Sequence, residues 1–149
     1  MGAVAYDQDF YSWALDQAAL LREGKFDQLD FEHLVEEIED MGNRHYDQLE
    51  SRLAVLFMHL LKWMYEPSHR GASWTNTIRE QRRMIPFHLK KYPGLKGKLV
   101  TILEDSYELA REGARDETGL PLNVFPEKCP WTFEQALNPE FWPESAEQA

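Results

Sequence analysis

The chain has 149 residues, of which 43% are hydrophobic and 28% charged, and its formal net charge is −10 at pH 7. This size suits one ordinary domain with its own core, and the composition excludes a wholly disordered chain. The single cysteine, Cys129, excludes an intramolecular disulfide and a zinc site built from cysteines, and it favours a reducing, cytoplasmic location.

Two helices are predicted in the first half of the chain. Asp7 can cap the first, whose apolar residues recur at helical spacing until Gly24, a typical helix stop. Asp30 can cap the second, whose apolar stripe continues until Pro67 ends it. Residues 42–43, a Gly-Asn pair, could divide this helix. The phase of the stripe is nearly kept across the pair, which favours one long helix.

The most apolar run of the chain, from Leu53 to Tyr65, is too short to cross a membrane. It has 13 residues and includes His59 and Lys62, whereas a membrane-spanning helix needs about 20 predominantly apolar residues. No second run of this kind occurs, so the sequence predicts no membrane association. It places this segment in the core of the protein instead.

Two further helices are predicted in the second half of the chain. Ser73 can cap the first of them. Pro86 lies inside its apolar pattern, where the missing backbone donor predicts a kink or a break. The second helix begins near Leu95 and ends at Gly119, a typical C-terminal stop.

The segment after Gly119 is rich in proline and aromatic residues. Thr132 and Gln135 make a capping box for one short helix, and the aromatic side chains predict that the segment packs back onto the body. We therefore predict an all-α fold, an up-and-down bundle of about four main helices with this C-terminal extension packed on it. The expected domain is single, over residues 1–149, with the bundle core in 7–119 and the tail in 120–149.

Charge is segregated along the chain. Residues 1–61 carry a net charge of −9, residues 62–98 one of +7, and residues 99–149 one of −8. In one interpretation, the basic third helix pairs with carboxylates of its neighbours and helps to order the bundle. In the other, it forms a phosphate- or RNA-binding face from Arg79, Arg82, Arg83, Lys90, Lys91, Lys96 and Lys98, with Trp74, Phe87 and Tyr92. The net negative charge of the chain opposes nucleic-acid binding.

The acidic stretch EHLVEEIED raises the question of a metal site. His33 and Glu37 are four residues apart and so lie on one helical face, a geometry that a metal can use. The apolar stripe of this helix, however, turns most of the carboxylates outward. A di-metal bundle requires a Glu-x-x-His motif on two helices, and the sequence offers only Glu66 to His69, at a helix end interrupted by proline. A solvated acidic face is the better interpretation, and we predict no metal and no cofactor.

A ligand-binding or catalytic hypothesis rests on four polar residues. His59 lies beside apolar positions of the second helix, and Lys62 follows it by about one turn. Together with Ser73 or Arg79 of the third helix, this pair could serve acid–base chemistry. A single histidine on an apolar face is more often a satisfied core residue, so the sequence leans away from an enzyme.

Five stretches of the chain, taken in order, resemble one bacterial family. They are YDQDFYSW, LREGKFDQLDFEHLVEEIEDMG, SRLAVLFMHLLKWMYEP, SWTNTIREQR and TGLPLNVFPEKCPWTFEQALNPEFWP. Together they cover nearly the whole chain and resemble the family called domain of unknown function 29. The resemblance implies an all-helical, bacterial, cytoplasmic protein, and it carries no activity or catalytic residue. Its most distinctive blocks, His59 to Trp63 and Ser73 to Arg82, contain the four polar residues above.

Three functional hypotheses follow. The leading one is a non-enzymatic helical bundle that binds a partner protein or itself, which predicts a sizeable apolar patch left exposed by the fold. The second is a small-ligand or catalytic site where His59, Lys62, Ser73 and Arg79 converge. The third is nucleic-acid binding through the basic third helix, which the overall charge makes the weakest of the three.

Overall fold

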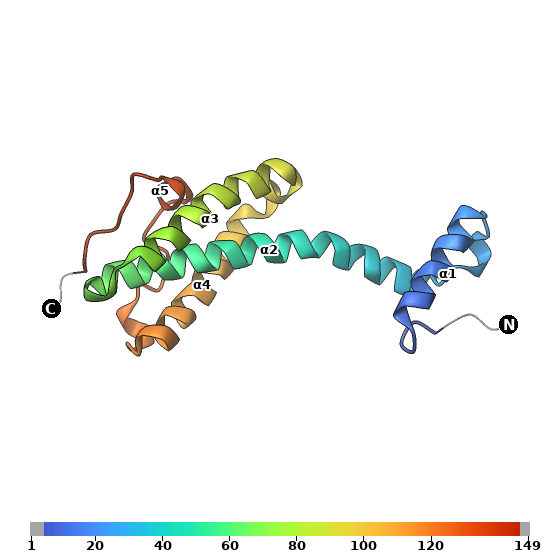
Figure 1. Ribbon diagram of the computed structural model, residues 1–149, viewed down its shortest axis with the longest axis horizontal. Coiled ribbons are helices and arrows are strands. Elements are labelled where there is room, and N and C mark those ends of the chain that lie inside the picture. The colour runs from blue at the N-terminus through green and yellow to red at the C-terminus, as the bar shows by residue number, and fades with distance from the viewer. Residues whose placement is uncertain (1–4, 147–149) are drawn as a thin grey trace. The chain divides into compact units, whose positions relative to one another are not determined.

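The computed structural model describes residues 5–146, and these are helical and free of strands (Figure 1). The α-helices are α1 (Phe10–Arg22), α2 (Phe31–Tyr65), α3 (Ala72–Lys91), α4 (Leu99–Thr118) and α5 (Phe133–Leu137). Short 3-10 helices lie between them, at Phe26–Gln28, Pro67–His69, Pro93–Lys98 and Leu122–Val124. The predicted all-α fold with about four main helices is confirmed.

The chain forms two compact units, one that ends at Arg44 and one that begins at His45. We call them unit 1 and unit 2. Helix α2 contributes its first part to unit 1 and its second part to unit 2. The single domain expected over residues 1–149 stays a prediction.

Unit 1 consists of α1, a 3-10 turn and the first part of α2. Helix α1 begins two residues later than a cap at Asp7 would place it, because Asp9 is the cap and its carboxylate accepts the backbone N–H of Ser12 at 3.0 Å. It ends at Arg22, just before Gly24, whose φ of 73° lies in the left-handed region that glycine favours. The stop predicted at Gly24 is thus confirmed.

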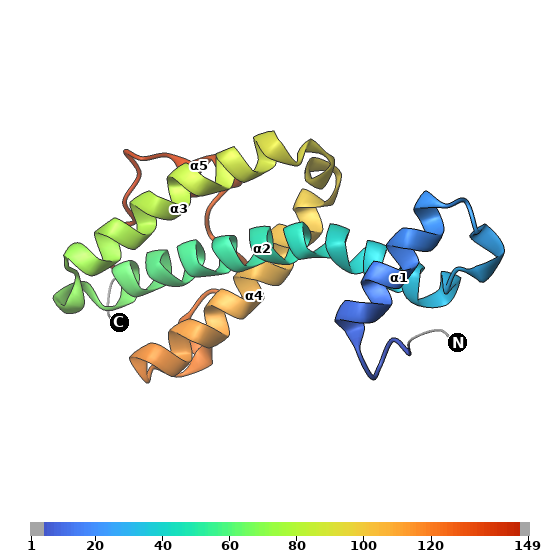
Figure 2. The same ribbon diagram turned by 45° about the vertical axis from the view of Figure 1, so that its right-hand side comes forward.

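Unit 2 is a helical bundle closed by the C-terminal tail. Helices α3 and α4 pack against the second part of α2, and α5 lies beside α3 (Figures 1 and 2). The centre of the core is fully buried and comes from every one of these elements: Leu49, Leu53, Leu56, Phe57, Leu60, Leu61, Ile78, Ile85, Ile102, Ala110, Ala114, Phe125 and Ala136. The predicted packing of the tail onto the bundle is confirmed by Phe125 and Ala136.

Several local signals acted as predicted. Helix α2 runs unbroken through residues 42–43. Gly119 ends α4 with a φ of 76°. The capping box is present, since Thr132 accepts from the backbone of Gln135 and the Gln135 side chain accepts from the backbone of Thr132.

Besides the cap at Asp7, two local predictions were wrong. Gly71, rather than Ser73, precedes the first turn of α3, and no side chain caps that turn. Helix α4 begins at Leu99 rather than near Leu95, because a 3-10 helix forms first. Of the two outcomes expected at Pro86, the break does not occur, since α3 continues to Lys91, and the kink stays a prediction. Within residues 5–146, none of the helices has both the length and the apolar character required for crossing a membrane.

Candidate functional site

Asp30 organises unit 1 at the start of α2. Its carboxylate accepts the indole N–H of Trp13 at 3.0 Å and the ring Nδ1–H of His33 at 2.7 Å. The Gln17 side-chain oxygen accepts the backbone N–H of Asp30 at 2.8 Å. Trp13 and Gln17 are the buried residues of α1, so these contacts fix α1 against α2 through polar bonds more than through an apolar core.

These contacts also set the charges of the two ionisable groups. Hydrogen bonding to the Asp30 carboxylate raises the pKa of His33, and the same bond lowers the pKa of Asp30. The ring of Tyr6 stacks on the ring of His33, with the two centroids 4.0 Å apart. The Tyr6 hydroxyl donates to the Glu37 carboxylate, which raises the pKa of Tyr6 to about 12. His33 and Glu37 are therefore engaged by different partners. Across residues 5–146, no cluster of three His, Cys, Asp or Glu side chains has metal-binding geometry.

The most distinctive surface of the molecule belongs to unit 1. Nine of the 13 exposed large hydrophobic side chains in the described part of the chain lie there, although unit 1 contributes far fewer residues than unit 2. We call these nine the unit 1 apolar surface: Phe10, Tyr11, Leu15, Leu21, Phe26, Phe31, Val35, Ile38 and Met41. An accumulation of exposed apolar side chains of this kind is typical of protein–protein contact sites.

Four members of this surface form one stripe along α2. Phe31, Val35, Ile38 and Met41 are spaced by three or four residues, which places them on one helical face. Their side chains are 59%, 52%, 65% and 60% exposed. Residues 26–43 also hold seven carboxylates and no lysine or arginine, so the stripe runs along an acidic segment.

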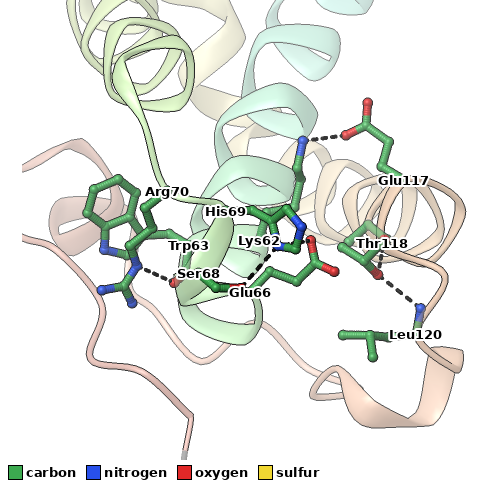
Figure 3. Close-up of polar contacts among 10 residues, drawn as sticks. Lys62, Trp63, Glu66, Ser68, His69, Arg70, Glu117, Thr118 and Leu120 are labelled. Carbon is green, nitrogen blue, oxygen red and sulfur yellow. Dashed lines mark hydrogen bonds and ion pairs between the residues drawn. The ribbon is translucent and has the colours of Figure 1, made fainter.

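His59 and Lys62 are held by separate contacts. The Nδ1–H of His59 donates to the carbonyl oxygen of Val55 at 2.8 Å, and burial lowers the pKa of the ring. Lys62 Nζ lies 4.6 Å from the ring centroid of Trp74. It also donates to the Glu117 carboxylate at 2.7 Å, a bond drawn in Figure 3. Lys62 thus links α2 to both α3 and α4.

Ser73 and Arg79 are exposed on α3. The carbonyl oxygen of Ser73 accepts the hydroxyl of Thr77 at 3.0 Å. In the part of the chain that the structure describes, no hydrogen bond joins Ser73 or Arg79 to His59 or Lys62, and none of the four lines the cavity of about 610 Å³ between α4 and the tail. A catalytic or ligand site at these four residues stays a prediction.

Arg82 must be removed from the predicted phosphate-binding face. It is 6% exposed, and its guanidinium donates to the carbonyl oxygens of Ala136 at 2.8 Å and Phe141 at 2.7 Å. It also lies 5.2 Å from the ring centroid of Trp142. Arg82 therefore fixes the tail to α3. Its position four residues after Ile78 and three before Ile85 places it on the apolar face of the helix, a signal that the charge pattern alone does not use.

The remaining cations of this region stay exposed. None of the ion pairs within residues 5–146 involves them, so they do not pair with carboxylates of neighbouring helices as the first interpretation of the charge pattern expected. We call this set the basic surface: Arg79, Arg83, Lys90, Lys91, Lys96 and Lys98. Phe87 lies among these residues on α3 with 59% of its side chain exposed, and Val100, at 72%, follows on the first turn of α4.

Sequence reasoning missed a cavity of about 610 Å³ in unit 2, between α4 and the tail. Its aromatic lining comes from Phe57, Tyr107, Trp131 and Phe133. The Tyr107 hydroxyl donates to the carbonyl oxygen of Pro126 at 2.6 Å, which holds the tail in place. Burial raises the pKa of the Cys129 thiol in the same wall. Only the aromatic content of the tail signalled this region, since its partners come from other elements.

The comparison with protein families decides the relationship of the chain. The family model with the description "Domain of unknown function DUF29" matches residues 5–142. The chain belongs to this family. No curated protein and no solved structure matches the chain. The matched range covers most of both units, so the two units described above belong to a member of the family over nearly the whole chain.

Proposed function

We propose that this protein is a non-enzymatic interaction module whose unit 1 apolar surface is covered by another protein chain. The observation that carries the proposal is the exposure of Phe31, Val35, Ile38 and Met41 along one face of α2. Exposure of these apolar side chains to water is unfavourable, and a partner that covers them gains free energy. Full burial of each such side chain contributes roughly 1.5–3 kcal/mol. A cytoplasmic location belongs to the same proposal and is supported by the single free Cys129. A bacterial origin belongs to it as well and is what membership of the family implies.

The polar framework of unit 1 suits this function. The bonds of Asp30 to Trp13, Gln17 and His33 hold α1 and α2 without drawing on the exposed apolar side chains. These side chains therefore remain available to a partner. A surface presented on helices that are already held together loses less conformational entropy on binding than one that must first be ordered.

The test is site-specific photo-crosslinking in cells that express the protein. A photoreactive phenylalanine analogue replaces Ile38 on the exposed stripe and, in a matched control, Asp40 on the same helix. Asp40 is two residues away, so its side chain points away from the stripe. We expect protein adducts at position 38 that are absent or much weaker at position 40. Equal adducts at both positions, or none at position 38, would contradict the proposal.

A further inference from the structure

We propose that the unit 1 apolar surface is covered by the basic surface of a second copy of this chain. The inference rests on the proposed function and names the partner. Two regions of the same sequence carry opposite, unmixed charge. Residues 26–43 hold seven carboxylates and no lysine or arginine, and residues 81–103 hold six lysines and arginines and no carboxylate. Charge segregated in this way gives complementary potentials on contact.

The acidic segment of unit 1 combines negative charge with exposed apolar side chains. Glu32, Glu36 and Glu39 are exposed, and their spacing from the α2 stripe places them along its flank and on the opposite face. A partner that covers the stripe therefore meets carboxylates at its edge. No lysine or arginine lies in the same segment to neutralise them, so the partner must supply the cations.

The basic side has the corresponding composition. Arg83, Lys90 and Lys91 are exposed within one turn of Phe87, itself 59% exposed. None of these three cations takes part in an ion pair within the described residues. The basic surface thus offers unpaired cations around an exposed aromatic ring, which fits a face that has carboxylates beside an apolar stripe.

Pairing of unit 1 with another unit 1 is the less favourable alternative. It would cover both stripes, but it would also bring two acidic segments together without a cation between them, and like charges at an interface oppose association. In the proposed contact each copy supplies both surfaces. Two copies related by a two-fold axis can make the contact twice, so the smallest closed assembly is a dimer.

The first measurement is the mass of the intact wild-type chain by sedimentation velocity over a wide concentration range. We expect a concentration-dependent dimer. Its association should weaken by about tenfold or more between about 0.1 M and about 1 M salt, as the Debye length falls from about 10 Å to about 3 Å. A chain that stays monomeric at every concentration, or a dimer indifferent to salt, would overturn the inference.

The decisive experiment exchanges the charges of the two surfaces. One variant alters the acidic segment of unit 1 and is called the acidic variant; it carries Glu32→Lys, Glu36→Lys and Glu39→Lys. The other alters the basic surface and is called the basic variant; it carries Arg83→Glu, Lys90→Glu and Lys91→Glu. Each variant alone brings side chains of the same sign together at the exchanged positions, so we expect each to be monomeric. Mixed in equal amounts, the two variants bring opposite signs together at the exchanged positions of both contacts, and we expect the dimer to return.

The matched control changes the net charge by the same amount elsewhere, with Glu104→Lys, Glu108→Lys and Glu112→Lys on α4, and it should dimerise like the wild type. Circular dichroism checks that every variant keeps its helical content. If the basic variant still dimerises alone, unit 1 pairs with itself and the inference is wrong. If the equal mixture of the acidic and basic variants stays monomeric, the inference is also wrong.

The two proposals can fail separately. A monomeric wild-type chain that gives adducts with a different protein at position 38 overturns the second copy as partner and leaves the proposed function in place. A monomeric chain without adducts at that position removes both.

Discussion

The two parts of α2 carry the same apolar pattern, but the apolar side chains are buried in one part and exposed in the other. In the second part, Leu49, Leu53 and Leu56 are fully buried beneath α3, α4 and the tail. In the first part, Val35, Ile38 and Met41 are more than half exposed. Helical periodicity specifies which face of a helix is apolar. It does not specify whether the same chain supplies the cover, and that difference separates a core from a candidate interface.

The comparison predicts the largest difference for truncations at matched positions of the stripe. Leu56→Ala should lower the free energy of unfolding by about 2–5 kcal/mol, because it opens a cavity in a closed core. Ile38→Ala should change it by less than about 0.5 kcal/mol, since the side chain is exposed. Urea unfolding of both variants at low protein concentration, followed by circular dichroism, measures the pair. Similar costs would show that Ile38 is buried within the monomer.

A second prediction concerns what covers the second part of α2. Arg82→Met removes two hydrogen bonds to tail carbonyls and should cost about 2–3 kcal/mol, because charged donors are lost and buried acceptors remain. Arg83→Met is the control on the exposed side of the same helix and should cost less than about 0.5 kcal/mol. Urea unfolding gives the cost, and amide exchange in residues 133–142 shows whether the tail loosens. Equal effects would mean that Arg82 does not hold the tail.

The third and finest prediction compares one histidine from each part of α2. The pKa of His33 should lie above about 6.5, because Asp30 stabilises the imidazolium, and that of His59 should lie below it, because burial disfavours the charged ring. NMR titration of the two rings measures the order directly. In Asp30→Asn the pKa of His33 should fall, while that of His59 should not change. The reverse order in the wild type would contradict the assignment.

The signs of these shifts give opposite dependences of stability on pH. The raised pKa of His33 contributes stability to unit 1 below about pH 6.5, and this is lost as the pH rises through the folded-state value. The lowered pKa of Asp30 contributes above about pH 3.9 and is lost as the pH falls through its folded-state value. For His59, the lowered pKa means that unit 2 loses stability as the pH falls below about 6.5.

Signals that act within a few residues could be read from the sequence. The left-handed Gly119 after α4 and the Thr132–Gln135 box each depend on backbone groups nearby in the chain, so their outcome follows from local chemistry. The acceptors of Arg82 and the tail cavity could not be predicted in this way. Periodicity places Arg82, four residues after Ile78 and three before Ile85, on the apolar face of α3. The carbonyls that it contacts, however, lie more than 50 residues along the chain.

The same distinction between local and distant contacts applies to the candidate site. The acidic segment of unit 1 and the basic segment around Phe87 were both visible as charge patterns. In one interpretation of those patterns the basic side chains of the third helix paired with carboxylates of neighbouring helices, and the structure leaves the cations of the basic surface without such ion pairs among the described residues. Charge along a sequence shows that a surface is basic, whereas its partners depend on which helices come within a few ångströms.

The sequence by itself determined that this protein is helical, where most of its helices end and which face of each is apolar, because propensity, capping and periodicity act over one or two turns. Tertiary structure alone decided which apolar faces are covered. Leu56 and Ile38 share one stripe, yet α3, α4 and the tail cover the first and leave the second exposed. Burial depends on contacts between distant segments, and no local pattern along a single helix encodes them.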